Sequence, residues 1–241
     1  NAYFENSGWT TSNTKDLEKF SAVAYAFAYS LQKKLNVPVG IICNAIGGSP
    51  TQSWISRASM EQKHQTINLL NDTHLNPMVD AWVSERIVLN MKNQSKIKAR
   101  HPYQPTFLFD AGISPIKDYN IKGVIWYQGE SNTEHVQLHS ELFKMLVNDW
   151  RFHFKNEELP FYYVQLSSID RPNWGAFRDS QRRLLSIPNT GMVVSSDVGH
   201  PTDVHPKEKE VIGQRLANLA LAKTYHKNLL AESPRLFAYH W

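Results

Sequence analysis

The sequence has little cysteine and no long apolar run, and each absence excludes a class of protein. Cys43 is the single cysteine among 241 residues, which excludes an internal disulfide and a cysteine-based metal site. It follows the apolar run 39–42, so we expect Cys43 to be a buried strand residue. No stretch is long and apolar enough to span a bilayer, and residues 1–25 lack the basic-then-apolar layout of a signal peptide.

A strong charge of either sign is also missing. The 26 Lys and Arg residues nearly balance the 22 Asp and Glu residues, which leaves a formal net charge of +4. The basic residues are scattered, and the one local run, at 92–100, is typical of a solvated helix end, so we expect no nucleic-acid partner. Hydrophobic residues make up 41% of the chain and charged residues 20%, which is enough apolar material for a sizeable core. Without internal repeats or a long linker, residues 1–241 are expected to form a single domain.

Amphipathic segments alternate with short apolar runs along the chain. Apolar residues at three- and four-residue spacing predict helices at 15–35, 76–92, 134–154, 174–186 and about 206–225. Short apolar runs predict strands at 37–43, 122–127, 161–166 and 192–195. This alternation indicates an α/β protein, a three-layer α/β/α sandwich around a mainly parallel sheet. Ligands bind beyond the carboxyl ends of such strands, where the polar segments 44–52, 128–132 and 197–205 are expected to meet.

The segment after the first predicted strand contains Gly47 and Gly48. Two glycines let the backbone turn sharply and leave amide N–H groups uncovered, and such groups can stabilise an oxyanion. The alternative is a simple tight turn between a strand and a helix. A phosphate-binding loop is excluded because no Gly-Lys-Ser/Thr follows.

The segment after the next strand, 128–132, contains two side-chain amides. Gln128 or Asn132 could direct an amide N–H at a developing negative charge, and Glu130 could orient other groups. Gln128 is slightly favoured because the strand fixes its position. The alternative is a polar helix cap, in which Ser131 or Asn132 satisfies free backbone amides.

The segment 197–206 contains a histidine with an acidic neighbour. His205 precedes a proline that begins a helix, and Asp203 could hold its imidazole in the tautomer that a general base needs. The alternative is a surface histidine beside an aspartate helix cap. The pairs His200/His205 and His135/His139 could suggest metal ligands, but the His-Glu-x-x-His pattern is absent, so we expect neither a metal nor a cofactor.

Taken together, these segments resemble one family, the sialate O-acetylesterases and related bacterial carbohydrate acetylesterases of the SGNH-hydrolase superfamily. The resemblance covers nearly the whole chain. Its most specific stretch is 121–132, Ile-Lys-Gly-Val-Ile-Trp-Tyr-Gln-Gly-Glu-Ser-Asn. Further matching stretches are 20–25, 36–40, 47–49 with Trp54-Ile55, 159–165 and His205-Pro206.

The resemblance implies a flavodoxin-like fold and hydrolysis of an acetyl ester on a sugar, sialic acid or another acetylated glycan, by a serine–histidine–acid mechanism. His205 would be the base and Asp203 its orienting acid, with Asp197 in reserve, because the superfamily's usual spacing places the acid at position 202, which is Thr202 here. Gly48 (or Gly47) with Gln128 or Asn132 would form the oxyanion hole. Apart from the resemblance, Glu130 could bind a sugar hydroxyl as substrate. Trp54, Trp126 and Trp174 could stack on a sugar face, with Trp54 the expected contact, or each could equally be a core residue. The family habit of acting on exported glycans implies a secreted or periplasmic protein.

The chain departs from the family in one respect, because the nucleophilic serine is missing. The family's Gly-Gln-Ser-Asn-type segment occurs nowhere in the sequence, and Ser49, Ser53 and Ser131 already occupy other positions of the pattern. We therefore expect the domain to be incomplete at its N-terminus, with the serine on an upstream segment or a companion chain. The alternative is a catalytically inactive, carbohydrate-binding relative of the same fold.

Overall fold

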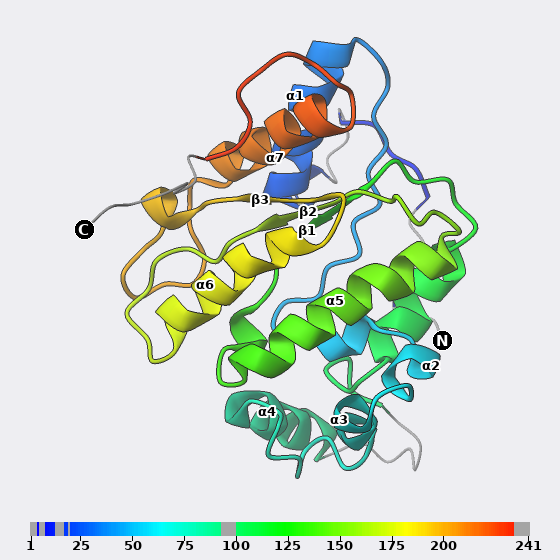
Figure 1. The fold of residues 1–241 in the computed structure, drawn as a ribbon, viewed down its shortest axis with the longest axis vertical. Helices are drawn as coiled ribbons and strands as arrows, with labels where there is room; N and C mark the ends of the chain where they lie inside the picture. The colour runs from blue at the N-terminus through cyan, green and yellow to red at the C-terminus, as the bar shows by residue number, and fades with distance from the viewer. Residues whose placement is uncertain (1–3, 5–7, 13–16, 19, 93–99, 234–241) are drawn as a thin grey trace.

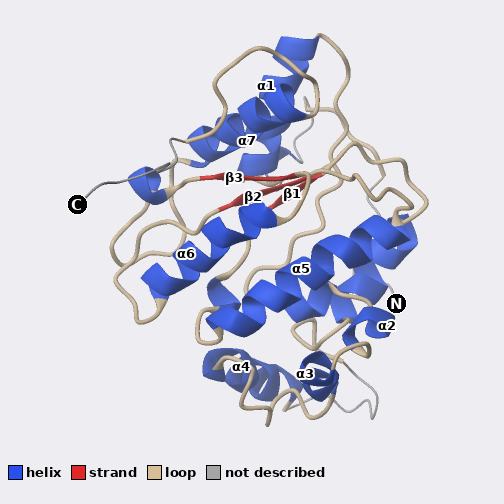
Figure 2. Cartoon of the chain, viewed as in Figure 1, coloured by secondary structure: helices blue, strands red, loops and turns tan. Residues whose placement is uncertain are grey.

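The computed structural model describes residues 4, 8–12, 17–18, 20–92 and 100–233. Within this part of the chain a parallel sheet contains β1 (Val124–Trp126), β2 (Phe161–Val164) and β3 (Thr190–Val193), in that order (Figure 2). Val124 aligns with Phe161, and Phe161 with Thr190, so the strands begin level with one another. Successive neighbouring strands that run parallel require helical crossovers, as the sequence predicts.

Helices cover both faces of the sheet and form the three-layer arrangement expected from the sequence (Figure 1). The helices α1 (Ala22–Leu35) and α7 (Lys209–Lys223) lie on one face, and α5 (Val136–His153) and α6 (Trp174–Arg183) lie on the other. Beyond α5 lie the shorter helices α2 (Arg57–Met60), α3 (His64–Ile67) and α4 (Ala81–Met91). Short 3₁₀ helices span Thr51–Trp54, Asn68–Leu70, Ser114–Ile116, Glu130–Asn132, Leu184–Ser186 and Ser196–Val198, and a π-helix spans Phe109–Ile113.

Apolar periodicity explains how the helices pack. On α5, the predicted inward positions Leu138, Leu142, Met145 and Trp150 are all buried. The helix packs in the main core cluster with Phe161 of β2. All four residues of β2 are buried, as expected for a central strand covered on both faces.

On the opposite face, α1 and α7 pack closely at a glycine. A Cβ on Gly213 of α7 would lie 2.7 Å from the carbonyl oxygen of Val23 on α1. Only glycine allows the two backbones to approach this closely. Leu31 of α1 and Leu216 of α7 share the second core cluster with Val164 of β2.

The predicted strand 37–43 is wrong for this structure. Residues 37–46 form no regular element, and among the described residues the outer edge of β1 pairs with no strand. A strand is defined by hydrogen bonds to a neighbour, and without one the apolar side chains of Val37 and Ile42 remain exposed. Cys43 is likewise exposed rather than buried.

Of the predicted helix 15–35, residues 15, 16 and 19 lie outside the described residues, and α1 covers Ala22–Leu35. It begins at Ala22, where the Ser21 hydroxyl caps the helix by accepting a hydrogen bond from the Ala24 amide. No helix in the described part of the chain is long and apolar enough to cross a membrane.

Candidate active site

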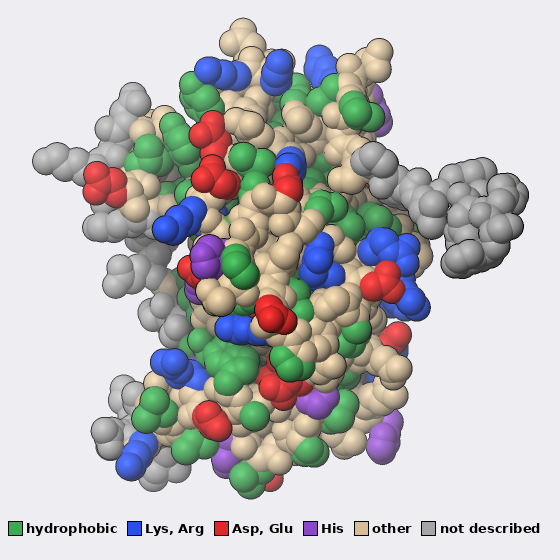
Figure 3. All heavy atoms as spheres, turned by 90° about the vertical axis from the view of Figure 1, so that its left-hand side faces the viewer, with side chains coloured by type: hydrophobic (Ala, Val, Ile, Leu, Met, Phe, Trp, Pro, Cys, Tyr) green, Lys and Arg blue, Asp and Glu red, His purple; other side chains and the backbone are tan. Residues whose placement is uncertain are grey.

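The polar segments singled out in the sequence follow the carboxyl ends of β1 and β3 or approach them from the long loop after α1. Figure 3 views this side of the molecule, where basic, acidic and histidine side chains are interspersed with hydrophobic ones. No single sign of charge dominates the face.

The Gly47–Gly48 turn presents an uncommitted backbone donor. Gly48 has a φ of 75°, a left-handed conformation that favours glycine, and the turn is closed by the Ser49 amide donating to the Ile46 carbonyl oxygen (3.2 Å). Within the described residues nothing accepts a hydrogen bond from the Gly48 amide. This is the uncovered amide that the two glycines predict.

A hydrogen-bonded network joins this turn to the loop after β1. The Thr51 amide and hydroxyl lie 2.9 and 3.1 Å from Oδ1 of Asn132, and the hydroxyl lies 2.7 Å from Oε1 of Gln128. Nε2 of Gln128 donates to the Ser49 carbonyl oxygen (3.1 Å) and to Oδ1 of Asn132 (3.0 Å). Nδ2 of Asn132 donates to Oε1 of Gln52 (3.0 Å).

The same network distinguishes the two side-chain amides. Both hydrogens of the Gln128 amide are used within the network, at Ser49 and at Asn132. Asn132 donates one hydrogen to Gln52 and keeps a second that has no acceptor among the described residues. Its orientation is fixed because the Thr51 amide must face an oxygen. The structure therefore favours Asn132 over Gln128 as the free donor, contrary to the slight preference from the sequence.

Serines near this turn are engaged in holding it. The Ser131 hydroxyl donates to the Gly48 carbonyl oxygen (2.9 Å). The Ser49 hydroxyl donates to the Ile46 carbonyl oxygen (2.8 Å) and accepts from the Trp54 indole (3.0 Å). Both serines are buried, as is Ser53. Ser49 and Ser131 support the backbone of the turn rather than face a substrate, and the buried Ser53 hydroxyl has no hydrogen-bond partner among the described residues.

Trp54 is a core residue, which corrects its predicted role in substrate binding. Its side chain is 3% exposed and packs edge-on against Trp126, with ring centroids 6.1 Å apart. Its carbonyl oxygen also accepts a hydrogen bond from the Trp150 indole (2.8 Å). The indole of Trp54 is enclosed on every side, so it has no face left for a sugar.

His205 and Asp203 form a pair on the neighbouring loop. Oδ1 of Asp203 accepts from the His205 amide (2.8 Å) and lies 3.3 Å from its Nδ1. The hydrogen bond from the His205 amide, and then the nearby His205 ring, lower the pKa of Asp203, so its carboxylate is charged at neutral pH. The imidazole side chain is 80% exposed, so its Nε2 is open to an incoming group.

The reserve candidate Asp197 is committed elsewhere. Both of its carboxylate oxygens receive hydrogen bonds from the Arg215 guanidinium, with Nη1 2.7 Å from Oδ1. These bonds lower the pKa of Asp197. A bidentate pair of this kind holds the carboxylate against α7 and away from the imidazole of His205.

Glu130 connects the two parts of the site electrostatically. Burial raises the pKa of Glu130, while the nearby charges of His205 and Lys209 act to lower it. Lys209 lies over the ring of Tyr127, 5.7 Å from its centroid. Burial, and then the charge of Glu130, raise the pKa of Tyr127 to about 12. Glu130 therefore lies within electrostatic range of the predicted base, although no hydrogen bond joins it to His205.

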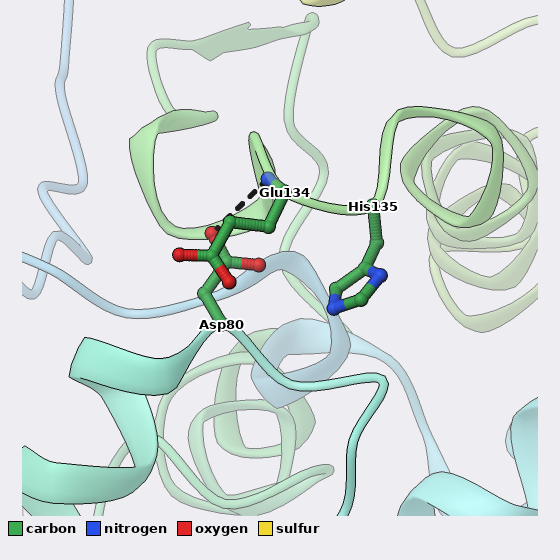
Figure 4. A group of neighbouring side chains, drawn as sticks. All are labelled: Asp80, Glu134 and His135. Atoms are coloured by element: carbon green, nitrogen blue, oxygen red, sulfur yellow. Dashed lines mark hydrogen bonds between the residues drawn. The ribbon is translucent and has the colours of Figure 1, made fainter. Parts of the chain in front are cut away.

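Two carboxylates and a histidine gather at the start of α4, where they could hold a metal ion. Asp80, Glu134 and His135 each offer a ligand atom, and these atoms lie within 4.8 Å of one another (Figure 4). Oδ2 of Asp80 accepts a hydrogen bond from the Glu134 amide (3.4 Å). Burial, and then the charge of Glu134, raise the pKa of the Asp80 carboxyl to about 6. The sequence did not indicate this cluster, because Asp80 is distant along the chain from Glu134 and His135.

Two aromatic residues beside the glycine turn were also missed. The Tyr103 hydroxyl donates to the Gly47 carbonyl oxygen (2.7 Å), and the ring of Trp82 lies against Tyr103, with centroids 6.0 Å apart. A signal for Trp82 was present in the sequence. Val83 and Ile87 are the buried positions of α4, so their neighbour Trp82 falls outside its apolar stripe.

Comparisons with known proteins agree on one family. The sequence profile of the family described as "Carbohydrate esterase, sialic acid-specific acetylesterase" matches residues 87–222. The mouse and human proteins named sialate O-acetylesterase are each 28% identical over 241 positions, covering 89% of this chain. A solved structure of a carbohydrate acetylesterase from Xanthomonas citri is 33% identical over 90% of this chain, with a TM-score of 0.70.

The relatives are much longer than this chain. The chain spans 44% of the mouse protein, 41% of the human protein and 44% of the Xanthomonas chain. The matched profile includes the loop after β1 and the loop that contains His205, and the structural likeness covers the parallel sheet and its helix layers. On these grounds the chain belongs to the sialic acid-specific acetylesterase family of carbohydrate esterases.

Proposed function

We propose that this chain supplies the general base and the oxyanion hole of a carbohydrate O-acetylesterase. The observation that carries the proposal is the network joining the Gly47–Thr51 turn to the Gln128–Asn132 loop. It leaves two hydrogen-bond donors without acceptors among the described residues, the Gly48 amide and one N–H of Asn132. Fixed donors of this kind stabilise the charge that develops on an ester carbonyl oxygen during acyl transfer.

His205 is the proposed general base, and Asp203 is the acid that positions it. With Nδ1–H directed at Oδ1 of Asp203, the lone pair of the His205 ring lies on Nε2, which can then accept the proton of a nucleophile. The engagement of Asp197 by Arg215 supports the choice of Asp203. Glu130 is proposed to contact the substrate, since it lies close enough to His205 for the histidine to act on its pKa.

The nucleophile is proposed to be a serine outside the 241 residues, on an upstream segment or a companion chain. Ser49, Ser53 and Ser131, the serines nearest to the glycine turn, are buried, and the hydroxyls of Ser49 and Ser131 donate to backbone carbonyl oxygens. The outer edge of β1, which pairs with no strand among the described residues, could accept an additional strand. The greater length of the relatives is consistent with such a segment.

The proposed reaction is a two-step acyl transfer. The serine oxygen attacks the acetyl carbonyl carbon while its proton passes to Nε2 of His205, and the Gly48 and Asn132 donors hold the resulting oxyanion. The intermediate then expels the sugar oxygen, which takes the proton from His205. Water repeats the sequence on the acetyl-serine and releases acetate. The substrate is proposed to be an O-acetylated sugar, such as an acetylated sialic acid, on a glycan outside the cytoplasm, so the protein is proposed to be secreted or periplasmic.

The proposal is tested first by comparing the 241-residue chain with the full-length protein. The chain alone should hydrolyse p-nitrophenyl acetate barely above background and should not react with a serine-directed fluorophosphonate. The full-length protein should do both. Labelling of the isolated chain would place the nucleophile on one of its own serines. A full-length protein that binds acetylated sugars without hydrolysing them would instead be the inactive, carbohydrate-binding relative.

The base is tested in the full-length protein. His205→Ala should lower kcat by about 10³-fold or more, the scale of losing a triad base. The matched control is His200→Ala, which removes a histidine from the same loop and should cost little. A larger loss from His200→Ala would move the role of the base to His200.

A further inference from the structure

An exposed tryptophan lies directly beside the proposed oxyanion donor. Trp82 is the second residue of α4, and its side chain is 37% exposed, against 3% for Trp54. A Cβ placed on Gly48 would lie 3.0 Å from Cη2 of Trp82 and would clash with the Tyr103 hydroxyl. The indole therefore reaches to van der Waals distance of the residue whose amide is proposed to hold the oxyanion.

Contact with a neighbouring aromatic ring fixes the position of this indole, although the indole is partly exposed. Tyr103 meets the Trp82 ring at an interplanar angle of 75° and donates its hydroxyl hydrogen to Gly47. Tyr103 is itself packed edge-on by His101, with ring centroids 4.7 Å apart. The chain thus holds a large apolar side chain at the surface in a defined orientation, with more than a third of its area left in contact with water.

Polar groups gather at the backbone where the helix of Trp82 begins. The Glu134 carboxylate lies 3.4 Å from the amide of Ala81, the residue before Trp82. His135 and Asp80 adjoin this carboxylate. Hydrogen-bond acceptors and donors at the edge of an aromatic face suit a ligand that has both C–H faces and hydroxyl groups.

We propose that Trp82 is the platform on which the sugar ring of the substrate stacks, with Glu134 accepting a hydrogen bond from a sugar hydroxyl. This inference rests on the proposed esterase function and deepens it, because it assigns the subsite for the alcohol half of the ester. The axial C–H bonds of a pyranose carry partial positive charge, and they meet the negative π-face of the indole. An ester whose carbonyl oxygen is held at Gly48 has its sugar ring within reach of the neighbouring indole.

The test compares two esters in the full-length protein, an O-acetylated N-acetylneuraminic acid and p-nitrophenyl acetate, which has no sugar ring. Trp82→Ala should raise KM for the sugar ester about three- to tenfold, the scale of one aromatic contact, with kcat nearly unchanged. Hydrolysis of p-nitrophenyl acetate should not change, and Trp82→Phe should restore most of the affinity for the sugar. The matched control is Leu89→Ala, which removes another exposed apolar side chain, 65% exposed, from the same helix and should affect neither ester.

Each other outcome has a separate meaning. Equal losses on both esters, or no loss on either, would overturn the platform. Equal losses with a lower Tm would overturn it as well, because they would show that Trp82 supports the fold rather than the sugar. If the wild type hydrolyses neither ester, the esterase proposal fails, and the platform is then judged by binding alone. In that case N-acetylneuraminic acid should show saturation transfer from the wild-type protein and much less from Trp82→Ala, and equal transfer would overturn the inference.

Discussion

At the scale of single residues, Gly48 has two independent reasons to be glycine. Its φ of 75° costs other residues about 1–2 kcal/mol, and a Cβ would clash with Tyr103. We therefore expect Gly48→Ala to lower the free energy of unfolding by at least about 1–2 kcal/mol, measured by urea denaturation. Gly47→Ala is the matched control, because a Cβ on Gly47 would meet nothing within 4 Å. Similar losses in the two variants would contradict this explanation.

The two amides of the loop after β1 are expected to differ in what they contribute. Asn132 has a free N–H, so in the full-length protein Asn132→Ala should lower kcat by about 10²- to 10³-fold with a smaller effect on KM. Both hydrogens of the Gln128 amide are donated to Ser49 and Asn132, so Gln128→Ala should lower Tm and leave kcat nearly unchanged. Steady-state kinetics with thermal unfolding of both variants separates the roles. A loss of kcat confined to Gln128→Ala would reverse them.

Substitutions of Asp203 and Asp197 are also expected to differ in their effects on kcat and on stability. Asp203→Asn should lower kcat of the full-length protein more than Asp197→Asn does, because only Asp203 contacts His205. Asp197→Asn removes the charge that pairs with Arg215, so its effect should appear mainly as a modest loss of stability. If Asp197→Asn gave the larger loss of kcat, the acid would be Asp197.

At the scale of elements, the buried carboxyl at the start of α4 should make stability depend on pH. The pKa of Asp80 is raised from 3.8 to about 6, so the folded state holds this proton more tightly than the unfolded chain does. The contribution of this carboxyl to the free energy of unfolding is therefore most favourable below about pH 4. The free energy of unfolding falls by about 3 kcal/mol as the pH rises to about 6, and above that pH this contribution no longer changes. Asp80→Asn removes this cost while keeping the side-chain size.

The expected result for Asp80→Asn is greater stability than the wild type at about pH 8, by up to about 3 kcal/mol, with the difference vanishing near about pH 4. Urea unfolding at several pH values measures it. Glu134→Gln is the control, because it removes the exposed neighbour and should reproduce only part of the gain. A difference that does not change with pH would show that the Asp80 carboxyl is not the cause.

The elements themselves show why some of the fold could be read from the sequence. Helix α5 has its apolar residues on one stripe, and β2 is a short apolar run between two helices, so local patterns were sufficient for both. The run 37–43 has the same local pattern as β2. It forms no strand because strand formation depends on a hydrogen-bonding neighbour, which a local pattern does not reveal.

In the candidate site, too, some features could be predicted from the sequence and others could not. The positions of Gln128 and Asn132 follow from the rule that ligands bind beyond the carboxyl ends of parallel strands, whereas Gly48 follows a segment that forms no strand. Which of two amides keeps a free hydrogen depends on every partner in the network, and sequence could not supply that. The sequence also could not show which tryptophan is available to a substrate. Whether Trp54 or Trp82 is exposed depends on packing between segments that are distant along the chain.

At the scale of the whole molecule, the outer edge of β1 presents backbone N–H and C=O groups that no strand covers within the described residues. An open sheet edge is a template on which another chain can add a strand, and no proline interrupts Val124–Trp126 to prevent it. The 241-residue chain, produced alone, should therefore self-associate as its concentration rises, whereas a protein that fills this edge should remain monodisperse. Sedimentation velocity over a concentration series would measure the difference. The edge at which an additional strand is proposed to join the sheet would then also be the origin of aggregation whenever that strand is absent.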